Sequence, residues 1–372
     1  MTNNMDNTPK VMHESKNKIR VDFERTDLKT RLKTKYLSTF FLTRATWFLF
    51  RFLLLLGIAF VVIQPFYTMI IRSFMAPRDF ADAAVVMVPK GLSIGIYKAI
   101  ITDAHYIKVF FSTLGLSLAT ALLQTFSACL VGYGLAKFKF RGNKIVFFAV
   151  IFTLVVPHGT LQAAMYHRFR YFDVLGIFKF LSGGTVTGIG WLDGILSKIK
   201  ILPFAEGFNL LNTIAPLILL SVFALAFKNG LYIFMLRQFF RGVPDELEES
   251  AYLDGANTFR TFIQVILPLS VPMMITVFLF AFCWQWTDDF YIPLFFTSAE
   301  RPALMTFLTP SAENLPFPSL QAALSGQAHG APGYKTAMIY GCGMMACTPL
   351  IILYLFCQKY LVQGIERSGI VG

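Results

Sequence analysis

The sequence has few charged residues for its length of 372. Only 15% of its residues are Asp, Glu, Lys or Arg, whereas soluble globular domains carry about 25%. Hydrophobic residues make up 55% of the chain and include 40 Phe. The shortage of charge and the long apolar runs argue against an ordinary large soluble domain and predict an all-α, polytopic membrane protein.

Patterns for metal binding and catalysis are also scarce. The five cysteines all lie in apolar runs at spacings that fit no zinc pattern, and the five histidines are scattered. The glycine-rich run GGTVTGIG at 183–190 is not followed by the Gly-Lys-Ser/Thr that completes a P-loop, and we interpret it as a turn. We therefore predict no metal site, no catalytic residues and no ATP hydrolysis by this chain alone.

Positive charge is concentrated at the start of the chain, which carries a net charge of +12 overall. Of the 33 Lys and Arg residues, 11 lie in residues 1–51, before and at the edge of the first apolar run. Such flanking cations usually mark the cytoplasmic side of a membrane span. We interpret residues 1–48 as a basic cytoplasmic segment, not as a nucleic-acid site, and the first apolar run as a retained span.

Six apolar runs are long enough to cross a bilayer, which needs about 20 mostly apolar residues. We predict spans at roughly 49–71, 109–135, 145–165, 214–236, 270–296 and 336–358. If both termini are cytoplasmic, the inner segments hold 20 Lys and Arg and the outer segments hold 12, which favours this orientation. Residues 49–372 then form one transmembrane domain, with an extracytoplasmic insertion at about 176–209.

The polar segment at about 237–269 interrupts the apolar pattern between the fourth and fifth spans. Pro244 and an acidic first turn predict the start of a short helix, and Asp254-Gly255 predicts its end. Asn257 or Thr258 can cap a second helix, whose predicted apolar face is Phe259, Phe262, Ile263 and Ile266.

Pro268 and Pro272 are then expected to break the chain before the fifth span. The segment is thus predicted to form two short helices at an angle on the cytoplasmic face, with an apolar stripe and a small stripe at Ala251 and Gly255 that need a partner. An amphipathic hairpin lying on lipid is the alternative. The acidic first turn argues against it, because the inner leaflet is itself anionic.

Polar residues near the fourth and fifth spans are candidates for a substrate path, because intramembrane polar groups are often functional. These candidates are Lys228, Asn229, Trp284, Gln285, Asp288 and Asp289. Structural roles remain open: Trp286 and Tyr291 can anchor an interface, the two aspartates can lie at the outer mouth, and Lys228 can form a structural pair.

The 237–269 segment resembles the EAA loop of ABC-importer permeases, which runs approximately Glu-Ala-Ala-x-x-Asp-Gly-Ala and continues to Leu-Pro. Here it reads Glu249-Ser250-Ala251-Tyr252-Leu253-Asp254-Gly255-Ala256 with Leu267-Pro268 downstream, and Ser250 is the one departure in the core. GYGLAKFKFRGNK (132–144), FMLRQFFRGVPDELEESA (234–251) and QKYLVQGIERSGIVG (358–372) are similar to the second, six-span permease of maltose-type and multiple-sugar importers. The basic N-terminus and the 176–209 insertion lie outside this resemblance, and the Lys-Gly that often ends the family is absent.

The resemblance implies a type I ABC-importer permease, a non-catalytic subunit in a bacterial plasma membrane that forms half of the path for a sugar or oligosaccharide. It implies a second homologous permease, two ATPase subunits that bind ATP and Mg, and an extracytoplasmic binding protein, with no cofactor on this chain and no nucleic acid. The residues it assigns to ATPase coupling are Glu248, Glu249, Ser250, Ala251, Asp254, Gly255, Ala256 and Pro268.

Three other interpretations stay open. The same machine can carry another solute, such as a peptide, a polyol or glycerol phosphate. A secondary transporter would need an ion-coupling site and often inverted repeats; no clear repeat is visible, and the EAA-like loop would go unexplained. A membrane enzyme has the least support from the residues.

Overall fold

The computed structural model describes residues 39–76, 79, 82, 85, 88–173, 208–226, 228–298, 302, 304–308 and 332–369. The chain divides into two compact units, residues 1–66 and residues 67–372, with the division inside a helix. The described residues are helical, apart from loops and two isolated β-bridges, Met75 with Leu92 and Phe172 with Phe208. This confirms the predicted all-α class.

Helices follow one another along the described part of the chain. In chain order, the α-helices are α2 (Thr39–Ser73), α3 (Gly95–Asp103), α4 (Tyr106–Lys137), α5 (Asn143–Val155), α6 (Gln162–Arg170), α9 (Ala215–Val222), α10 (Asn229–Arg241), α11 (Glu246–Leu253), α12 (Thr258–Thr261), α13 (Leu267–Trp286), α14 (Tyr291–Phe295) and α17 (Pro332–Gly369). Short 3₁₀ turns occur at His158–Leu161 and Met305–Phe307, and Phe262–Ile266 forms a π-helical turn between α12 and α13.

Four helices among the described residues are long and apolar enough to cross a membrane: Thr43–Ser73, Tyr106–Lys137, Thr258–Trp286 and Lys335–Leu361. The predicted third span is a bent pair, Asn143–Val155 and His158–Arg170, whose axes differ by 100°. The bend lies at Pro157, whose missing N–H and fixed φ favour a helix break. The predicted fourth span, 214–236, consists of two shorter helices, α9 and α10.

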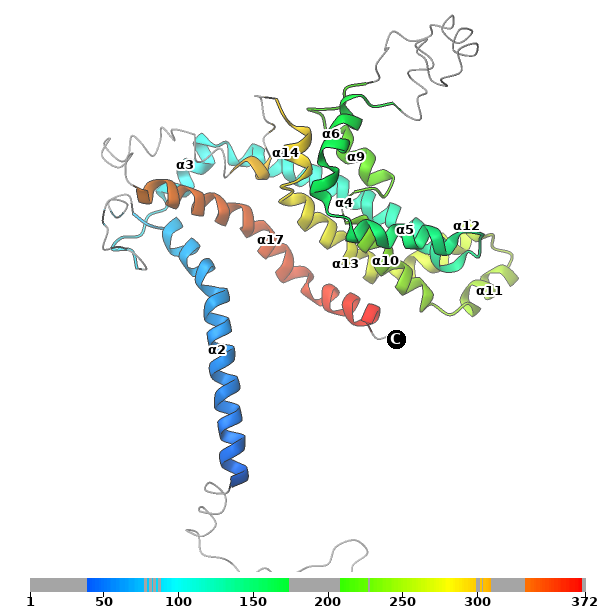
Figure 1. Cartoon of the computed structure of the whole chain (residues 1–372), viewed down its shortest axis with the longest axis horizontal. Helices are drawn as coiled ribbons and strands as arrows, with labels where there is room; N and C mark the ends of the chain where they lie inside the picture. The colour runs from blue at the N-terminus through cyan, green and yellow to red at the C-terminus, as the bar shows by residue number, and fades with distance from the viewer. Residues whose placement is uncertain are drawn as a thin grey trace, which may run out of the picture. The chain divides into compact units, whose positions relative to one another are not determined.

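Helix α4 lies in the middle of the second unit, between α10 and α13 (Figure 1). Its close approach to α10 depends on Gly132, because a Cβ there would meet the backbone N of Arg237 at 3.2 Å and the backbone O of Ile233 at 3.3 Å. Against α13, Phe110 of α4 packs on the buried ring of Trp286, with ring centroids 5.6 Å apart, and the indole of Trp286 in turn donates a hydrogen bond to the carbonyl of Ala346 in α17 at 3.0 Å. The core of this unit is thus built around α4.

The fifth span differs from the expectation that Pro268 and Pro272 break the chain. The helix runs without a break from Thr258 through the π-helical turn into α13, and Pro268 sits in the first turn of α13. Proline lacks the N–H of an α-helical bond, and a π-helical turn just before it is one way to absorb the misfit. The second short helix is therefore the beginning of the span, which ends at Trp286 and not near residue 296.

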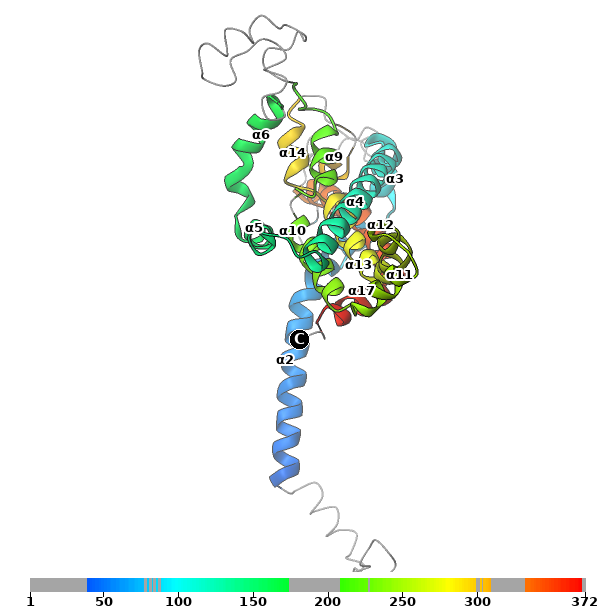
Figure 2. The same ribbon diagram turned by 90° about the vertical axis from the view of Figure 1, so that its right-hand side faces the viewer.

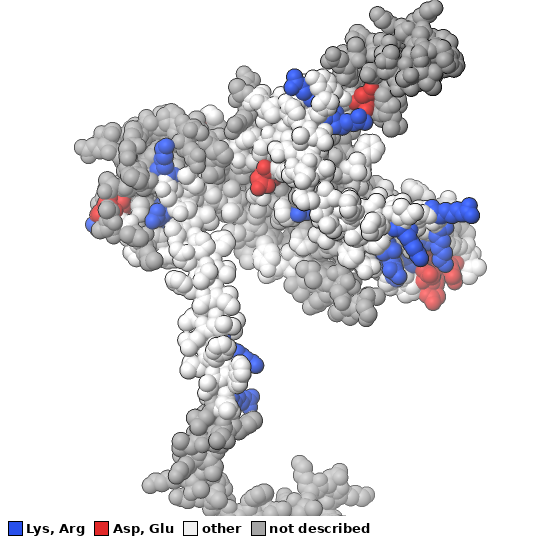
Figure 3. Space-filling view, in the orientation of Figure 1, with Lys and Arg blue, Asp and Glu red and all other residues white. Residues whose placement is uncertain are grey.

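The two ends of the second unit carry different elements. Helices α11 and α12 lie at one end, and α6, α9 and α14 lie toward the other, as both ribbon views show (Figures 1 and 2). From the side drawn in Figure 3, acidic and basic residues gather at the α11 end and the surface between is largely uncharged. Two predicted segments lie mostly outside the described residues: the basic N-terminus (1–48) and the insertion (176–209).

Candidate functional site

The first candidate site is the corner formed by α11 and α12, where the sequence predicts a helix pair. Helix α10 ends at Arg241, and Gly242, Val243 and Pro244 lead into α11. Three carboxylates lie in the first turn of α11, next to the positive end of the helix dipole, which favours negative charge. The helix therefore starts where the pattern of Pro244 and acidic residues predicts it.

The turn between α11 and α12 is fixed by backbone hydrogen bonds around Gly255. The N–H of Ala256 donates to the carbonyl of Ala251 at 2.9 Å, and the N–H of Gly255 donates to the carbonyl of Tyr252 at 3.0 Å. These two bonds form a Schellman motif, which needs a left-handed residue after the helix. Gly255 supplies it with a φ of +80°, and no atom lies within 4 Å of where its Cβ would be.

The second helix begins at the predicted cap. The side chain of Asn257 accepts a hydrogen bond from the N–H of Arg260 at 2.8 Å, which satisfies one of the unpaired donors at the start of α12. The predicted apolar face divides here: Phe262 and Ile266 are buried in the core, whereas Phe259 is exposed and Ile263 is partly exposed.

The outer surface of this corner mixes large apolar and acidic side chains. Leu253 is 89% exposed and Phe259 is 73% exposed, although such side chains are normally buried. The predicted coupling residues Glu249, Ser250, Asp254, Gly255 and Pro268 are exposed, and Ala251 and Ala256 are partly buried. Glu248 is different, because it is buried and faces inward.

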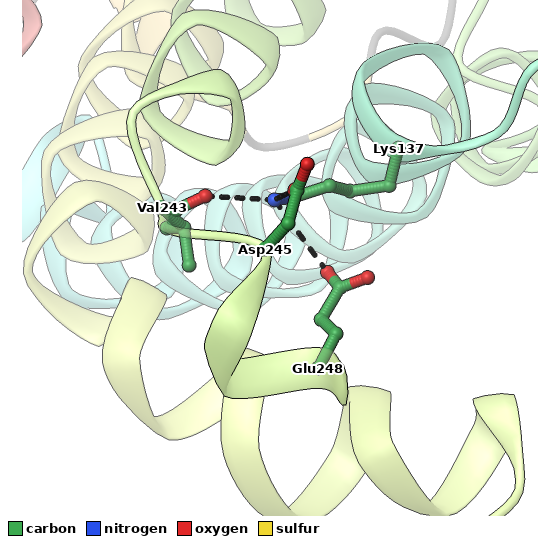
Figure 4. A network of polar contacts seen from close by, with 4 residues as sticks. All are labelled: Lys137, Val243, Asp245 and Glu248. Atoms are coloured by element: carbon green, nitrogen blue, oxygen red, sulfur yellow. Dashed lines mark hydrogen bonds and ion pairs between the residues drawn. The ribbon is translucent and has the colours of Figure 1, made fainter. Parts of the chain in front are cut away.

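Lys137, the last residue of α4, holds the start of α11 (Figure 4). Its Nζ donates to the carbonyl of Val243 at 2.7 Å and to Oδ1 of Asp245 at 2.5 Å. Oε1 of Glu248 lies 3.9 Å from the same nitrogen, an ion-pair distance. The Lys137 side chain is only 7% exposed, so the charge is largely withdrawn from water.

This cluster shifts the two carboxylates in opposite directions. The hydrogen bond from Lys137 holds the pKa of Asp245 below its usual value. Burial raises the pKa of Glu248 above its usual value, and the charge of Lys137 opposes that rise. Sequence reasoning missed the role of Lys137, because a lysine at the end of a long apolar helix does not indicate that its partners lie more than 100 residues further along the chain.

The second candidate site is a pocket that brings together most of the predicted substrate-path residues. Lys228, Trp284, Gln285, Asp288 and Asp289 all line it. Sequence reasoning missed two further lining residues, Gln124 from α4 and Tyr232 from α10, because only the fold brings them next to the predicted ones.

Contacts within the pocket organise its polar groups. Nζ of Lys228 lies 4.2 Å from the ring centroid of Trp284, a cation–π distance. Oδ1 of Asp288 accepts from the N–H groups of Phe290 at 3.0 Å and Tyr291 at 2.9 Å, and Gln285 donates to its Oδ2 at 3.2 Å. Asp288 therefore shapes the chain after α13, whereas Asp289 is exposed.

Asn229, the sixth predicted residue of the path, does not line this pocket. It is fully buried at the start of α10, and neither its amide oxygen nor its amide nitrogen has a hydrogen-bond partner among the described residues. The next residue explains the tight packing: a Cβ on Gly230 would lie 2.5 Å from Thr153 Oγ1 of α5. The Tyr232 hydroxyl is likewise buried without a partner in the described part of the chain.

The segment Gly91-Leu92-Ser93-Ile94-Gly95 has the Gly-x-Ser-x-Gly spacing of many serine hydrolases. In the structure, Ser93 Oγ accepts a hydrogen bond from the N–H of Gly95 at 3.0 Å, at the start of α3. Among the described residues, no histidine or carboxylate is hydrogen-bonded to Ser93, and no cluster of three or more His, Cys, Asp or Glu could hold a metal ion. The described side chains thus offer Ser93 no general base.

Comparison with protein families finds one match that covers most of the chain. Residues 128–367 match the family described as binding-protein-dependent transport system inner membrane component. This range includes α10 to α13 and therefore both candidate sites, apart from Gln124.

Individual relatives are similar over most of their length. The polygalacturonan/rhamnogalacturonan transport system permease YtcP of Bacillus subtilis is 24% identical over 86% of this chain and 96% of its own. The maltodextrin transport system permease MalD of Streptococcus pneumoniae is 27% identical over 86% of this chain and 93% of its own. A chain from the crystal structure of a bacterial ABC transporter that imports alginate superimposes with a TM-score of 0.61 at 18% identity, covering 86% of this chain and 97% of that one, which shows a common fold.

Proposed function

The chain belongs to the family of binding-protein-dependent transport system inner membrane components, and we propose that it is the six-span permease subunit of an ATP-driven importer for a sugar or oligosaccharide. Relatives whose names specify polygalacturonan, arabinooligosaccharides and maltodextrin support a carbohydrate cargo. The bent pair α5–α6 and the helices α9 and α10 then supply the third and fourth spans, with both termini cytoplasmic.

The observation that carries the proposal is the α11–α12 corner. It presents the exposed apolar side chains Leu253 and Phe259 beside the exposed carboxylates of Glu249 and Asp254. Burial of the apolar groups against a partner would be favourable, and carboxylates form strong charge-assisted bonds with arginine or lysine. Such a surface suits a cleft on a separate ATPase subunit, which binds ATP and Mg while this chain remains non-catalytic.

Transport then follows from movement of this corner. When ATP closes the two ATPase subunits, the docked α11 of each permease is drawn inward and the spans rock as rigid bodies. The Schellman turn at Gly255 keeps the corner stiff, so displacement of the ATPase reaches α10 and α13 with little loss. The two permeases, this chain and a second homologous one, enclose the path between them.

The polar pocket is the proposed contact with the cargo. Trp284 offers an aromatic face on which a sugar ring can stack, and Gln124, Gln285 and Asp289 can hydrogen-bond hydroxyl groups. Tyr232 also lines this pocket, and its buried hydroxyl has no partner among the described residues.

Co-purification tests the assembly. The full-length chain, tagged and extracted from its native membrane, is expected to bring down an ATPase subunit and a second permease. A chain that is isolated alone, and that takes up solute in vesicles without ATP, would instead be a secondary transporter.

Ligand screening of the cognate extracytoplasmic binding protein tests the cargo. We expect tight binding of an oligosaccharide and no binding of peptides, polyols or glycerol phosphate. Tight binding of one of those three classes, with the oligosaccharides inactive, would keep the machine and replace the cargo.

A further inference from the structure

Lys137 joins two parts of the chain that are more than 100 residues apart. Its ammonium group faces three oxygen atoms, those of Val243, Asp245 and Glu248, and all three belong to the lead-in and first turn of α11 (Figure 4). Two of these contacts are hydrogen bonds, to Val243 and Asp245, and the third, to Glu248, is an ion pair without a hydrogen bond. The side chain is 93% withdrawn from solvent, given its 7% exposure, so the contact is not a loose surface ion pair.

The same end of α4 is also fastened to α10 and to the start of the fifth span. Nε of Arg237 donates to the carbonyl of Leu135 at 3.3 Å. The ring of Tyr133 packs against Phe240 of α10 at 5.6 Å and against Phe262 of the π-helical turn at 4.8 Å, measured between ring centroids. Tyr133 also interacts electrostatically with Glu248 and Tyr252 of α11, and Lys137 adds hydrogen bonds to Val243 and Asp245 at the start of that helix.

Further along, α4 reaches the polar pocket. Gln124 lines the pocket and donates to Ser221 Oγ at 3.3 Å. It precedes Lys137 by 13 residues, about 20 Å along a helix at 1.5 Å per residue. One continuous helix therefore has its end on the proposed coupling corner and its middle on the proposed cargo site.

We propose that Lys137 is a positioning residue that fastens α11 to α4, so that displacement of α11 by the ATPase moves α4 and the Gln124 side of the pocket with it. This inference rests on the proposed function of the corner. It assigns a mechanical role to a residue outside the EAA-like segment. Without the ammonium, α11 would remain joined to α10 and α12 through the chain and would keep its contacts with Tyr133 and the π-helical turn, but it would lose the Lys137 hydrogen bonds that hold its start on α4.

Hydrogen exchange in the assembled transporter tests the proposal, with ATP plus vanadate as the probe. In Lys137→Met, amides of residues 246–253 should exchange about tenfold faster without nucleotide, the factor expected for loss of one charged hydrogen bond. In the unmodified protein, ATP plus vanadate should change exchange both in α11 and in residues 120–128. In the variant, the change in α11 should persist and the change in residues 120–128 should be lost.

Two matched variants separate position from charge. Lys139→Met removes the same charge from an exposed residue two positions further on, which influences Asp245 only weakly and through its charge, and should change both readouts far less than Lys137→Met. Lys137→Arg keeps a cation that can donate to the same oxygens and should restore the nucleotide response at residues 120–128. If Lys137→Met prevents assembly, Asp245→Asn, which removes only the most exposed partner, should accelerate exchange in α11 by less in the same direction.

Several outcomes would overturn the inference. Unchanged exchange in α11 for Lys137→Met, or for Asp245→Asn where Lys137→Met does not assemble, would show that the contact does not hold the helix. A preserved nucleotide response at residues 120–128 would show that α4 receives the movement by another route. A different result would separate the two proposals: in the unmodified protein, ATP plus vanadate does not change hydrogen exchange in α11, yet Lys137→Met still accelerates it. The proposed coupling role of the corner would then be wrong, whereas the contact between Lys137 and α11 would be supported.

Discussion

The α11–α12 corner and the polar pocket are built in opposite ways. The corner is one continuous segment whose shape is set by backbone hydrogen bonds between near neighbours, and its charged side chains are mostly exposed. The pocket is assembled from α4, α10, α13 and the chain after α13, and its acid Asp288 is buried and bonded to backbone N–H groups. One site is local and outward-facing, and the other is long-range and inward-facing.

The difference predicts how each region fails. A local turn depends on one or two special residues, so a single substitution can remove its shape while the rest of the chain stays folded. A long-range pocket shares its shape among several helices, so loss of one lining side chain weakens binding without destroying the site. Corner variants should therefore change the solute carried per ATP, and pocket variants should change the concentration of solute needed.

The largest expected effect is at Gly255. Gly255→Trp forces an L-residue into the left-handed region, which costs about 1–2 kcal/mol, and adds bulk at the proposed contact with the ATPase, which costs about 1–3 kcal/mol more. Together these predict a loss of coupled transport on the order of 100-fold. The measurement is uptake per ATP hydrolysed in vesicles, using the oligosaccharide that the binding protein selects.

Gly142 provides the matched control for this variant. It also has a positive φ, +95°, and no atom lies within 4 Å of where its Cβ would be, but it belongs to the turn before α5. Gly142→Trp should assemble with near-normal uptake per ATP. Glu249→Lys, within the corner, should lower uptake per ATP, but by less than Gly255→Trp does. Normal uptake per ATP in Gly255→Trp would remove the corner from the coupling mechanism.

A stability effect of intermediate size is expected at Asp288. Asp288→Ala leaves the N–H groups of Phe290 and Tyr291 without their acceptor, and an unsatisfied buried donor costs about 1–3 kcal/mol. The assembled transporter in detergent should therefore unfold at a lower temperature. Asp289→Ala, the exposed neighbour, should leave the midpoint close to that of the unmodified protein; equal midpoints for the two variants would contradict the structural role of Asp288.

The same contrast explains what the sequence could predict. Gly255 and Asn257 act on residues within five positions of themselves, so the end of α11 and the cap of α12 follow from local chemistry and are confirmed. The all-helical class follows from composition in the same way. Tertiary contacts are different: Lys137 and Gln124 gain their partners across more than 90 residues, and no local pattern indicates which partner they meet.

Proline shows where local rules mislead. Local chemistry predicts a break at Pro268, because proline cannot make the α-helical hydrogen bond. A π-helical turn just before it keeps the helix continuous instead, and packing of Phe262 and Ile266 into the core supports that turn. The fourth span shows the reverse, because the run predicted to be one helix is two in the structure, α9 and α10, and α10 begins at Asn229 directly after the charged Lys228.

A smaller effect is expected for Trp284 in the pocket. Trp284→Ala removes the aromatic face beside Lys228, and a cation–π contact at a partly exposed site is worth about 0.5–1 kcal/mol. The concentration of loaded binding protein for half-maximal uptake should rise about twofold to fivefold, the factor that this energy gives, with uptake per ATP unchanged at saturation. A change in uptake per ATP with no change in this concentration would place Trp284 with the corner instead.

The smallest expected effect is that of Asp245→Asn, because the side chain of Asp245 is 79% exposed and exposed ion pairs contribute little. Uptake per ATP should fall by less than about twofold. The pKa of Asp245 is held below its usual value of 3.8 by Lys137, so its contribution is complete above that value and is lost only as the pH falls through the lower, folded-state pKa. The ratio of variant to unmodified transport should therefore be the same at pH 6 and pH 8. A ratio that changes between these values would assign the titration to another group. Glu248 is one such group, because its pKa is raised and it faces the same ammonium.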